Sequence, residues 1–575
     1  MSERIYTGCE RIIKAKKFEN IKELITNTKE EYGTEPAFKF KDENSMRIMT
    51  YDEYIDEVNA LGTALISIGL KDKRIGVISE NRYEWEEAYL SIVCGTGIVV
   101  PLDKALPENE IFNLLERSEM EAIFYSAKYD EIMKKAHERG IGKVKFFISM
   151  DNNEKDGPIY SQKELVKLGK DLIKNGARSF LDAKINNKEM SVMLFTSGTT
   201  STSKAVQLSH ENICTNIYDI SSVFDVKKED TFLSFLPLHH VFECTVGFLY
   251  PVSIGASIAF CTGIRHIAEN LKEYQISVMI SVPVLFENMY KKVMKSIEEK
   301  GKLKKVKFGM KLGRITKAVG IDIRRKLFKE VLDNFGGKLR LFVAGAAAFD
   351  PEVEKGFNDL GIETYQGYGL TEASPVVAAE HRTCAKLGSI GRVFPSLEAK
   401  IIEPNELGVG ELAVRGPSVM LGYYNHIEKG ITDDGWLPTG DLAYIDKDGY
   451  IFITGRKKSV IVLKNGKNVY PEEAEALINK IPGVKESFVF GRPDKDDENS
   501  LKLGVEIVYD KDVVKDVYGV EKEEDIKKKL WEKVKEINKK MPKYKYIKEI
   551  IVTEEELIKT TTLKIKRFEE IKKVL

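Results

Sequence analysis

The sequence lacks the features of a chain that enters or crosses a membrane. Its 575 residues contain no apolar run of about 18 residues, the length that spans a bilayer as a helix. The N-terminal segment MSERIYTGCERIIKAKKFEN also lacks the apolar stretch of roughly 7–15 residues typical of a signal peptide. We therefore expect a cytoplasmic protein.

Cysteine is scarce, and its spacing does not match the usual metal motifs. There is no CxxC pair and no Cys/His cluster with the spacing of metal ligands. This pattern favours reduced, buried, small apolar side chains. The six residues are Cys9, Cys94, Cys214, Cys244, Cys261 and Cys384.

The chain has no excess of charge of either sign, since Lys+Arg and Asp+Glu each total 89. The whole-chain balance therefore gives no indication of a nucleic-acid partner. Residues 291–330 depart from it, with 15 Lys/Arg against 4 Asp/Glu and a net charge of +11. Three interpretations stay open: a solvated helical insertion, a surface that meets anionic lipid headgroups, or an RNA-binding arm.

The hydrophobic pattern predicts α/β layers with mostly parallel strands. Short apolar runs at 74–79, 121–126, 143–149 and 338–345 have the length and boundaries of buried strands. Residues 51–70 carry apolar side chains at helical spacing and reach a stop signal at Gly69. Alternation of this kind is typical of a parallel sheet covered by helices.

A second domain is expected near the C-terminus, because lysine and glutamate dominate the composition after about residue 470. Strand-like runs at 487–491 and 503–509 precede a charged helix over roughly 524–540, a pattern that suits a small α+β domain. The dipeptide Asp448-Gly449, just before this domain, predicts a two-residue turn that joins two strands in a hairpin. We place the boundary at GRKKSV, which gives domains 1–457 and 458–575.

A hydroxyl-rich segment carries the first indication of chemistry. An apolar strand ends at Thr196, and seven Ser, Thr and Gly residues then precede Lys204. Hydroxyls and backbone N–H groups in such a loop can bind phosphate oxygens, with Lys204 as a point charge. The Walker spacing is absent, and on composition alone such a segment is more often a flexible linker than a phosphate-binding loop.

Five further motifs follow this segment in order along the chain. They are FLPLHHVFE at 235–243, FVAGAAAFDP at 342–351, YQGYGLTE at 365–372 and the long stretch at 436–475, and the run IKTTTLKIKR at 558–567 comes last. Together with the hydroxyl-rich segment they resemble the adenylate-forming superfamily of acyl-CoA synthetases, adenylation domains and luciferases. The likeness spans about 520 residues and is greatest to long-chain fatty acid–CoA ligases. It implies a large N-terminal α/β domain with mixed sheets and a small, mobile α+β C-terminal domain.

The resemblance assigns nucleotide or coenzyme binding to residues in each motif. Tyr368 would lie against adenine, Asp441 would accept both ribose hydroxyls, Lys458 would be the hinge, and the turn at 464–468 would face the pantetheine tunnel. The full set is Thr196, Ser197, Gly198, Thr199, Thr200, Lys204, Gly345, Ala346, Ala347, Tyr365, Gln366, Gly367, Tyr368, Gly369, Asp441, Arg456, Lys458 and Gly466.

Catalytic roles are implied for four residues. Thr371 would contact the α-phosphate, and Glu372, with Thr196, would hold Mg²⁺, since a hard cation prefers oxygen ligands. His240 would orient the substrate, although a histidine among apolar residues is more often a core residue. Lys564 would bridge the carboxylate and the α-phosphate, because attack of one anion on another needs positive charge at that point.

The implied reaction joins a fatty acid to coenzyme A through an acyl-adenylate, with ATP and Mg²⁺. We also expect a homodimer and peripheral contact with the inner face of the membrane through 291–330. Two alternatives stay open. One is a synthetase that loads an acyl carrier protein. The other is a non-catalytic nucleotide-binding scaffold, because Ser201, Ser203 and Leu563 stand where the family usually has glycine, proline and glycine.

Overall fold

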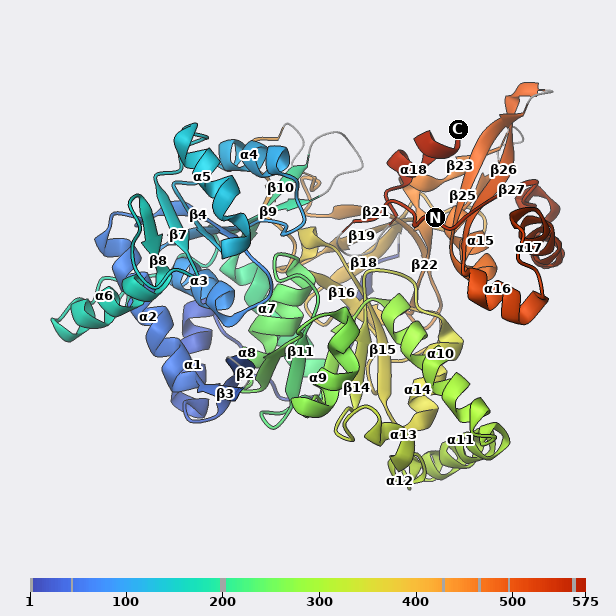
Figure 1. Ribbon diagram of the computed structural model, residues 1–575, viewed down its shortest axis with the longest axis horizontal. Helices are drawn as coiled ribbons and strands as arrows, with labels where there is room; N and C mark the ends of the chain where they lie inside the picture. The colour runs from blue at the N-terminus through green and yellow to red at the C-terminus, as the bar shows by residue number, and fades with distance from the viewer. Residues whose placement is uncertain are drawn as a thin grey trace. The chain divides into compact units, whose positions relative to one another are not determined.

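The computed structural model of the chain describes residues 4–42, 45–196, 203–426, 430–463, 467–494, 497–560 and 565–575. It divides into two compact units (Figure 1). The larger unit is Tyr6–Ala399 with Val414–Leu437, and the smaller is Met1–Ile5, Lys400–Ala413 and Pro438–Leu575.

The larger unit contains an eight-stranded sheet in the order β20-β10-β9-β5-β4-β6-β7-β8. Strands β9 to β8 in this order run parallel, and β10 and β20 join antiparallel. The bounds are β4 Lys73–Ile78, β5 Gly97–Pro101, β6 Ala122–Tyr125, β7 Phe146–Ser149, β8 Ile159–Ser161, β9 Met190–Thr196, β10 Lys204–Ser209 and β20 Gly422–Tyr423.

A nine-stranded sheet follows the order β17-β16-β15-β14-β13-β11-β12-β2-β3. Its inner strands from β15 to β2 are parallel, and antiparallel strands flank them on both sides. The bounds are β2 Pro36–Asp42, β3 Ser45–Thr50, β11 Thr231–Ser234, β12 Ser257–Phe260, β13 Val278–Ser281, β14 Leu341–Ala344, β15 Glu363–Gly369, β16 Val376–Ala379 and β17 Arg392–Val393.

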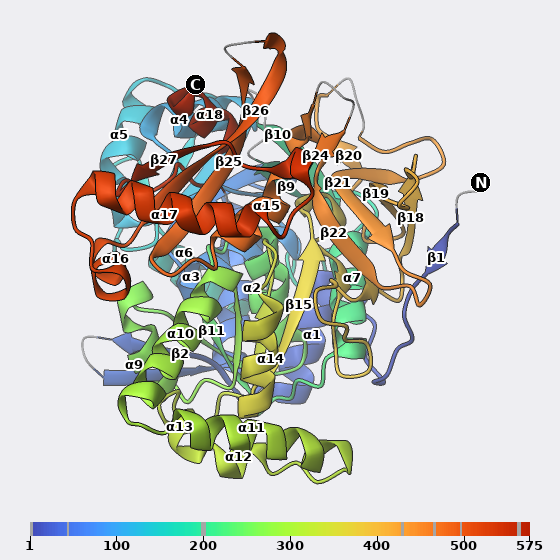
Figure 2. The ribbon, with the colours of Figure 1, turned by 90° about the vertical axis from the view of Figure 1, so that its right-hand side faces the viewer.

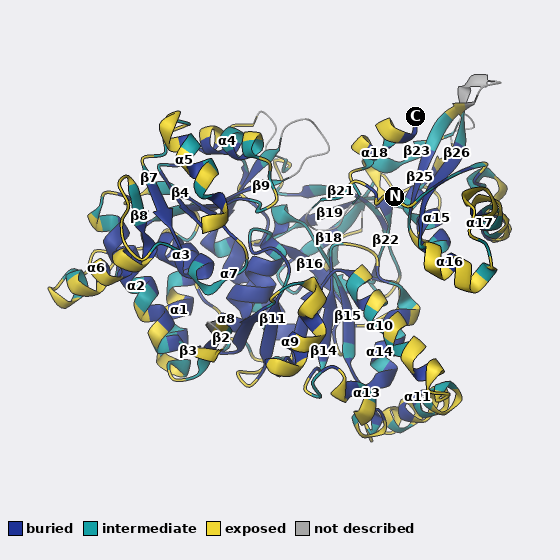
Figure 3. Cartoon of the chain, viewed as in Figure 1, coloured by how far each residue is buried: buried dark blue, intermediate teal, exposed yellow. Residues whose placement is uncertain are grey.

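Helices pack on these sheets and bury the strands (Figure 3). α4 and α5 contribute Leu115 and Met133 to a core with Ile123 and Phe147 of the first sheet. The helical bounds are α1 Ile21–Tyr32, α2 Tyr51–Ser67, α3 Tyr83–Val93, α4 Glu108–Arg117, α5 Asp130–Glu138, α6 Gln162–Lys174, α7 His210–Val223, α8 Tyr250–Ser253, α9 Ile267–Glu273, α10 Pro283–Glu299, α11 Leu303–Ala318, α12 Arg324–Leu327, α13 Lys329–Asp333 and α14 Pro351–Leu360. Short 3₁₀ turns are η1 Ala127–Tyr129, η3 Ile264–His266 and η4 Thr371–Ala373, and η2 Glu243–Leu249 is a π-helix.

Local sequence explains why these elements form where they do. α2 begins at a capping box, in which Thr50 and Glu53 each bond the other's backbone N–H. The four apolar runs in the sequence correspond to β4, β6, β7 and β14, and the periodic segment at 51–70 corresponds to α2. The predicted α/β class with mixed sheets is confirmed.

The smaller unit contains the sheet β25-β26-β27, with α17 packed across it (Figure 2). Ile526, Leu530 and Val534 of α17 share a core with Val505 and Ile507 of β26. The bounds are β23 Ile461–Val462, β24 Asn468–Val469, β25 Val484–Asp494, β26 Asp497–Tyr509, β27 Glu549–Thr553, α15 Pro471–Ile478, α16 Lys511–Tyr518, α17 Glu523–Asn538, α18 Arg567–Val574, η5 Lys457–Ser459 and η6 Lys543–Lys545. The two strands and the charged helix predicted here are confirmed.

A five-stranded sheet has the order β1-β18-β19-β21-β22. Its bounds are β1 Tyr6–Thr7, β18 Glu398–Ile402, β19 Gly410–Arg415, β21 Leu437–Ile445 and β22 Ile451–Arg456. The two-residue hairpin predicted at Asp448-Gly449 is wrong, since the chain turns over 446–450. The Asp446 carboxylate accepts the backbone N–H groups of Asp448 and Tyr450, each at 2.9 Å, and a longer turn therefore forms.

Within the described ranges, no helix combines the length and apolar character needed to cross a bilayer. All six cysteines are free, and every one except the half-buried Cys261 is buried.

Candidate functional site

The two ends of the hydroxyl-rich segment lie side by side. Thr196 ends β9 and Lys204 begins β10, and they pair directly in the antiparallel ladder. The Thr196 hydroxyl donates to the Lys204 carbonyl at 3.3 Å. The predicted phosphate-binding segment thus leaves and rejoins the sheet at one point. Ser197, Gly198, Thr199 and Thr200, also predicted to bind phosphate, lie outside the described residues.

Arg117, at the end of α4, holds the base of this segment. Its guanidinium donates to the Ser203 hydroxyl at 3.0 Å and to the Ser203 carbonyl at 2.5 Å, and lies 5.5 Å from the Phe195 ring centroid. A second cation is therefore one residue from Lys204. Sequence reasoning missed Arg117, because 86 residues separate it from Ser203 and no motif marks it.

Tyr423 connects Lys204 to Glu372. Its hydroxyl donates to Oε1 of Glu372 at 2.8 Å, and its ring centroid lies 4.7 Å from Nζ of Lys204. The β20–β10 ladder fixes Tyr423 opposite Val206, and the Met420 amide donates to the Glu372 carbonyl at 2.8 Å. Backbone pairing therefore positions a hydroxyl, a carboxylate and an ammonium group together. Sequence reasoning missed Tyr423, which lies outside every motif it used.

The oxygen donors in this region suit a hard divalent cation. Glu372 supplies a half-buried carboxylate on η4, whose orientation the Tyr423 hydroxyl fixes. Thr196 supplies a hydroxyl beside Lys204, and Thr371 precedes Glu372 on the same half-buried turn. Carboxylate and hydroxyl oxygens are the protein ligands that Mg²⁺ takes when it also binds phosphate.

Glycines allow close backbone packing around the ends of β14 and β15. A Cβ on Gly369 would lie 2.1 Å from the Pro375 carbonyl, and one on Gly345 would lie 2.9 Å from the Phe242 ring. The contact at 369 is with backbone, so only glycine fits there, whereas a side chain at 345 would require the Phe242 ring to shift. Ala346 then adopts φ of 73°, a left-handed conformation that turns the chain after β14.

The predicted adenine-side residues of β15 differ in exposure. Gly367 and Tyr368 are half-buried, whereas Tyr365 is only 8% exposed, with its ring centroid 6.2 Å from that of Phe224. The Gln366 side chain accepts from the Phe349 amide at 3.3 Å and so ties β15 to the loop that contains Ala347, which is exposed.

Two buried acids, Glu354 and Glu380, lie next to β15. Glu380 accepts the amides of Gln366 at 3.2 Å and Lys386 at 2.8 Å. Burial, together with the charge of Glu380, raises the pKa of Glu354 on α14 to about 8. Burial also raises the pKa of Glu380 to about 7. The pair therefore retains a proton near neutral pH, which sequence reasoning did not predict.

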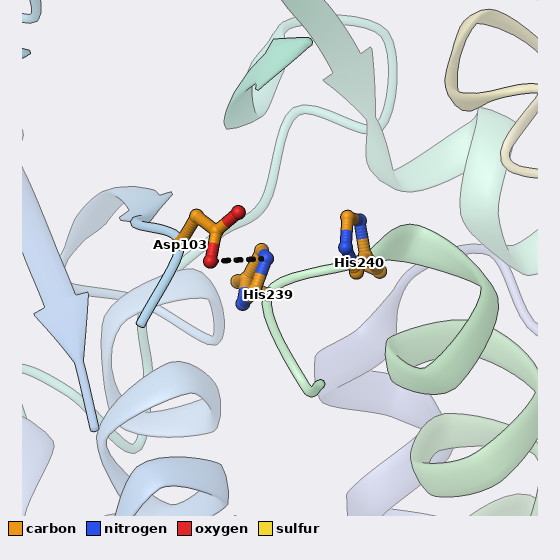
Figure 4. Close-up of side chains that lie close together, drawn as sticks. All are labelled: Asp103, His239 and His240. Carbon is orange, nitrogen blue, oxygen red and sulfur yellow. Dashed lines mark ion pairs between the residues drawn. The ribbon is translucent and has the colours of Figure 1, made fainter. Parts of the chain in front are cut away.

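His239 and His240 lie beside Asp103, which follows β5 (Figure 4). Nε2 of His239 is 3.4 Å from Oδ1 of Asp103, and the two imidazole centroids are 4.2 Å apart. The His239 side chain is 8% exposed and borders an apolar cavity of about 10 Å³ with Tyr89 and Leu194. One potential ligand atom from each of Asp103, His239 and His240 falls within 4.8 Å of the others, so this group has the composition of a transition-metal site.

His240 leads directly into the π-helix η2. Its carbonyl accepts the Cys244 amide at 2.9 Å, and η2 itself begins at Glu243. Glu243 is fully buried and accepts from the Ser234 hydroxyl at 2.7 Å, and burial raises its pKa to about 8. π-helices often occur at functional sites. The role of His240 in orienting substrate stays a prediction.

Asp441 and Arg456 form a pair in the smaller unit. They face each other across the β21–β22 ladder, with Nε of Arg456 2.9 Å from Oδ1 of Asp441. The Asp441 side chain is 7% exposed, whereas that of Arg456 is 53% exposed. Lys458 lies two residues further on in η5 and is exposed, and Gly466 lies outside the described residues.

Lys564 lies outside the described residues, but both flanks of its segment are fixed. Lys559 pairs with Ile565 in an isolated antiparallel bridge, and the Lys566 amide donates to the Ile558 carbonyl at 2.8 Å. We call these paired flanks, residues 557–560 and 565–567, the Lys564 hairpin. Sequence reasoning did not predict this closure.

Two carboxylates from distant elements hold the hairpin. Glu486 of β25 pairs with Nζ of Lys559 at 2.8 Å and accepts the Leu557 amide at 3.0 Å. Glu570 of α18 accepts the Ile558 amide at 2.7 Å. The backbone that enters the hairpin is thus bound by two acids, neither of which the sequence motif contains.

Two family models match most of the chain. The AMP-binding enzyme model matches residues 25–424, and the model of the AMP-binding enzyme C-terminal domain matches residues 458–573.

Individual proteins also match this chain, at modest sequence identity. Fatty acyl-CoA synthetase B of Dictyostelium discoideum is 28% identical over 532 residues, which cover 86% of this chain and 76% of that protein. A chloroplastic long-chain-fatty-acid–[acyl-carrier-protein] ligase of Arabidopsis thaliana is 24% identical and covers 91% and 81%. The crystal structure of an anthranilate CoA ligase with anthranoyl-AMP superimposes with a TM-score of 0.76 at 18% identity, over 97% of this chain and 98% of that one. At that identity the structural likeness establishes the fold.

Proposed function

Because the chain belongs to the AMP-binding enzyme family, we propose that it is a long-chain fatty acid–CoA ligase. The fatty acid carboxylate attacks the α-phosphorus of ATP, and the acyl-adenylate forms as pyrophosphate leaves. The thiolate of coenzyme A then attacks the acyl carbon, and AMP leaves with the electrons of the broken C–O bond. The main structural support is the arrangement of Lys204, Tyr423 and Glu372 where β20 pairs with β10.

Glu372 and Thr196 would hold Mg²⁺, which supplies positive charge to the phosphate oxygens. Tyr423 orients the Glu372 carboxylate through its hydroxyl, and Thr371 contacts the α-phosphate from the adjacent position. Lys204 and the hydroxyl-rich segment bind the departing phosphates. Arg117 adds a cation at the base of that segment.

The residues of the smaller unit complete the proposed chemistry. Asp441 accepts the ribose hydroxyls, and Arg456 balances its charge. Lys564 supplies the cation between carboxylate and α-phosphate, whereas Lys458 is the hinge and Gly466 borders the pantetheine path. In this proposal the segment 458–575 acts as a mobile lid over the 1–457 domain.

The acyl chain would occupy an apolar tunnel that begins near His240. Tyr89 and Leu194, which border the small cavity beside His239, give this location apolar side chains. Burial of each CH₂ group favours binding by about 0.8 kcal/mol, so a long tunnel selects long chains. The curated relatives that act on fatty acids support the same substrate class.

The test is pyrophosphate release with ATP, Mg²⁺ and a series of acids from acetate to stearate, in the presence and absence of coenzyme A. We expect a maximum between laurate and stearate, and dependence on Mg²⁺. A maximum at acetate would contradict the tunnel. Absence of pyrophosphate release with every acid would favour the nucleotide-binding scaffold instead.

The acceptor can be decided in the same assay. An acyl carrier protein is the second candidate, because one relative is a carrier-protein ligase. Acyl transfer to coenzyme A without carrier protein supports the proposal, and transfer to carrier protein alone rejects it. A homodimer and peripheral contact with the inner face of the membrane through 291–330 stay predictions alongside this function.

A further inference from the structure

Helix α11 (Leu303–Ala318) is largely exposed to solvent (Figure 3), and its exposed residues include a continuous apolar stripe. Phe308 is 69% exposed, Leu312 36%, Ile315 55% and Val319, just after the helix, 69%. Their spacing of four, three and four residues places them along one face. Large apolar residues exposed singly are ordinary, but four that adjoin on one helix form a patch that needs an explanation.

The opposite face of α11 is already packed against the larger unit. Met310 is 6% exposed and belongs to the core around Phe328 and Phe342. A Cβ on Gly313 would lie 2.7 Å from Cγ of Arg324, so the helix approaches its neighbour as closely as its backbone allows. The exposed stripe is thus a second apolar face, separate from the one that stabilises the fold.

Lysines border the exposed stripe. At about 100° per residue, Lys304 and Lys311 project on one side of it and Lys305 on the other, and Lys307 lies next to Lys311. All four are exposed. Among the described residues, none of these four takes part in an ion pair, in contrast with Arg314, which lies 3.1 Å from Asp359 and helps to fix the rotation of the helix.

We propose that α11 docks this protein on an anionic lipid bilayer. The helix lies in the plane of the interface, with the stripe among the acyl chains and the four lysines at the headgroups. Lysine side chains of this length can reach headgroups while their stems cover apolar surface. The net charge of +11 over residues 291–330 complements the negative inner surface of a membrane.

The combination of positive charge and exposed apolar side chains favours an anionic bilayer over an RNA or a second copy of the chain. An RNA would use the lysines but leave Phe308 and Ile315 in water. A second copy of the chain would cover the stripe but bring two sets of lysines together. Only the purpose of the docking rests on the proposed function, since a long-chain fatty acid partitions into bilayers. The binding itself needs no ligase activity.

The experiment measures co-sedimentation of the full chain with vesicles, without ATP or fatty acid. We expect binding to phosphatidylcholine vesicles that contain phosphatidylglycerol, binding at least tenfold weaker to pure phosphatidylcholine, and release at about 0.5 M salt. Phe308→Ser/Ile315→Ser should lower the partition coefficient at least tenfold. The matched control is Met46→Ser/Ile48→Ser, which removes two exposed apolar side chains of β3 and should leave binding unchanged.

A second pair of variants isolates the charge. Lys304→Glu/Lys311→Glu should weaken binding to anionic vesicles at least tenfold, whereas Lys527→Glu/Lys528→Glu, the same charge change on exposed lysines of α17, should have less than a twofold effect. Circular dichroism and the thermal midpoint establish that each variant is folded.

Several outcomes would overturn the docking. Equal binding to both vesicle types removes the role of charge, and full binding of Phe308→Ser/Ile315→Ser removes the role of the stripe. A change of mass by light scattering in that variant would assign the stripe to a second copy, and a defect limited to carrier-protein acylation would assign it to an acidic protein. Vesicle binding without pyrophosphate release would reject the ligase and leave the docking intact, and pyrophosphate release without vesicle binding would do the reverse.

Discussion

The Glu372 region and the Lys564 hairpin are positioned by different forces. Around Glu372, strand pairing sets the backbone, and one tyrosine hydroxyl orients the Glu372 carboxylate. At the hairpin, an isolated bridge closes the ends, and the carboxylates of Glu486 and Glu570 bind the backbone that leads into it. A side-chain change in the first region should therefore misdirect one group, whereas a change at the second should loosen a whole segment.

The sharpest test of this contrast is Lys564→Ala. Loss of the cation between carboxylate and α-phosphate should slow acyl-adenylate formation by about 10²–10³-fold or more, measured as acid-dependent ATP–pyrophosphate exchange. Thioester formation from supplied acyl-AMP should be largely retained. Lys566→Ala, an exposed lysine two residues further on, is the matched control. Equal loss of both half-reactions in Lys564→Ala would contradict the role assigned to this lysine.

Tyr423→Phe tests the orientation of Glu372. The variant removes one hydrogen bond to a charged group, so adenylation should slow by about 10–100-fold, and the Mg²⁺ concentration for half-maximal rate should rise. Tyr424→Phe provides the control, since the hydroxyl of that neighbouring tyrosine bonds Arg74 at 2.8 Å. If both variants had the same Mg²⁺ dependence as the unaltered chain, Tyr423 would have no part in holding the metal.

Glu486→Gln tests the anchor of the hairpin. The amide can still accept from Leu557 but no longer pairs with Lys559, whose side chain is only 21% exposed. We expect adenylation to fall by about 3–10-fold, as for loss of a partly buried ion pair. Glu556→Gln is matched to it, because Glu556 also approaches Lys559, at 3.7 Å, but is 82% exposed. A larger defect in Glu556→Gln than in Glu486→Gln would contradict the anchoring.

Sequence alone predicted the elements and the motif residues, but not the contacts between them. Strands such as β4 and β14 were predicted because each is a short apolar run, and α2 because its apolar spacing and capping residues are local. Arg117, Tyr423 and Glu486 were missed because each acts across 51 to 86 residues of chain through a tertiary contact. The length of the turn after Asp446 was also wrong, because it depends on side-chain hydrogen bonds that compete with the favoured two-residue turn.

The smallest expected effect concerns stability and the acid pair behind β15. The pKa values of Glu354 and Glu380, about 8 and about 7 in the folded chain, lie above the usual value of 4.5. Between these limits the native state binds more protons than the unfolded state, so the free energy of unfolding should fall as the pH rises from about 5 to 8. Glu354→Gln should flatten this dependence by at most one proton, or about 1.4 kcal/mol per pH unit, in urea unfolding series. The exposed Glu352→Gln in the same helix should leave the slope unchanged. An unaltered slope in Glu354→Gln would mean that the pair does not share a proton, and that Glu380 holds β15 as an ordinary carboxylate.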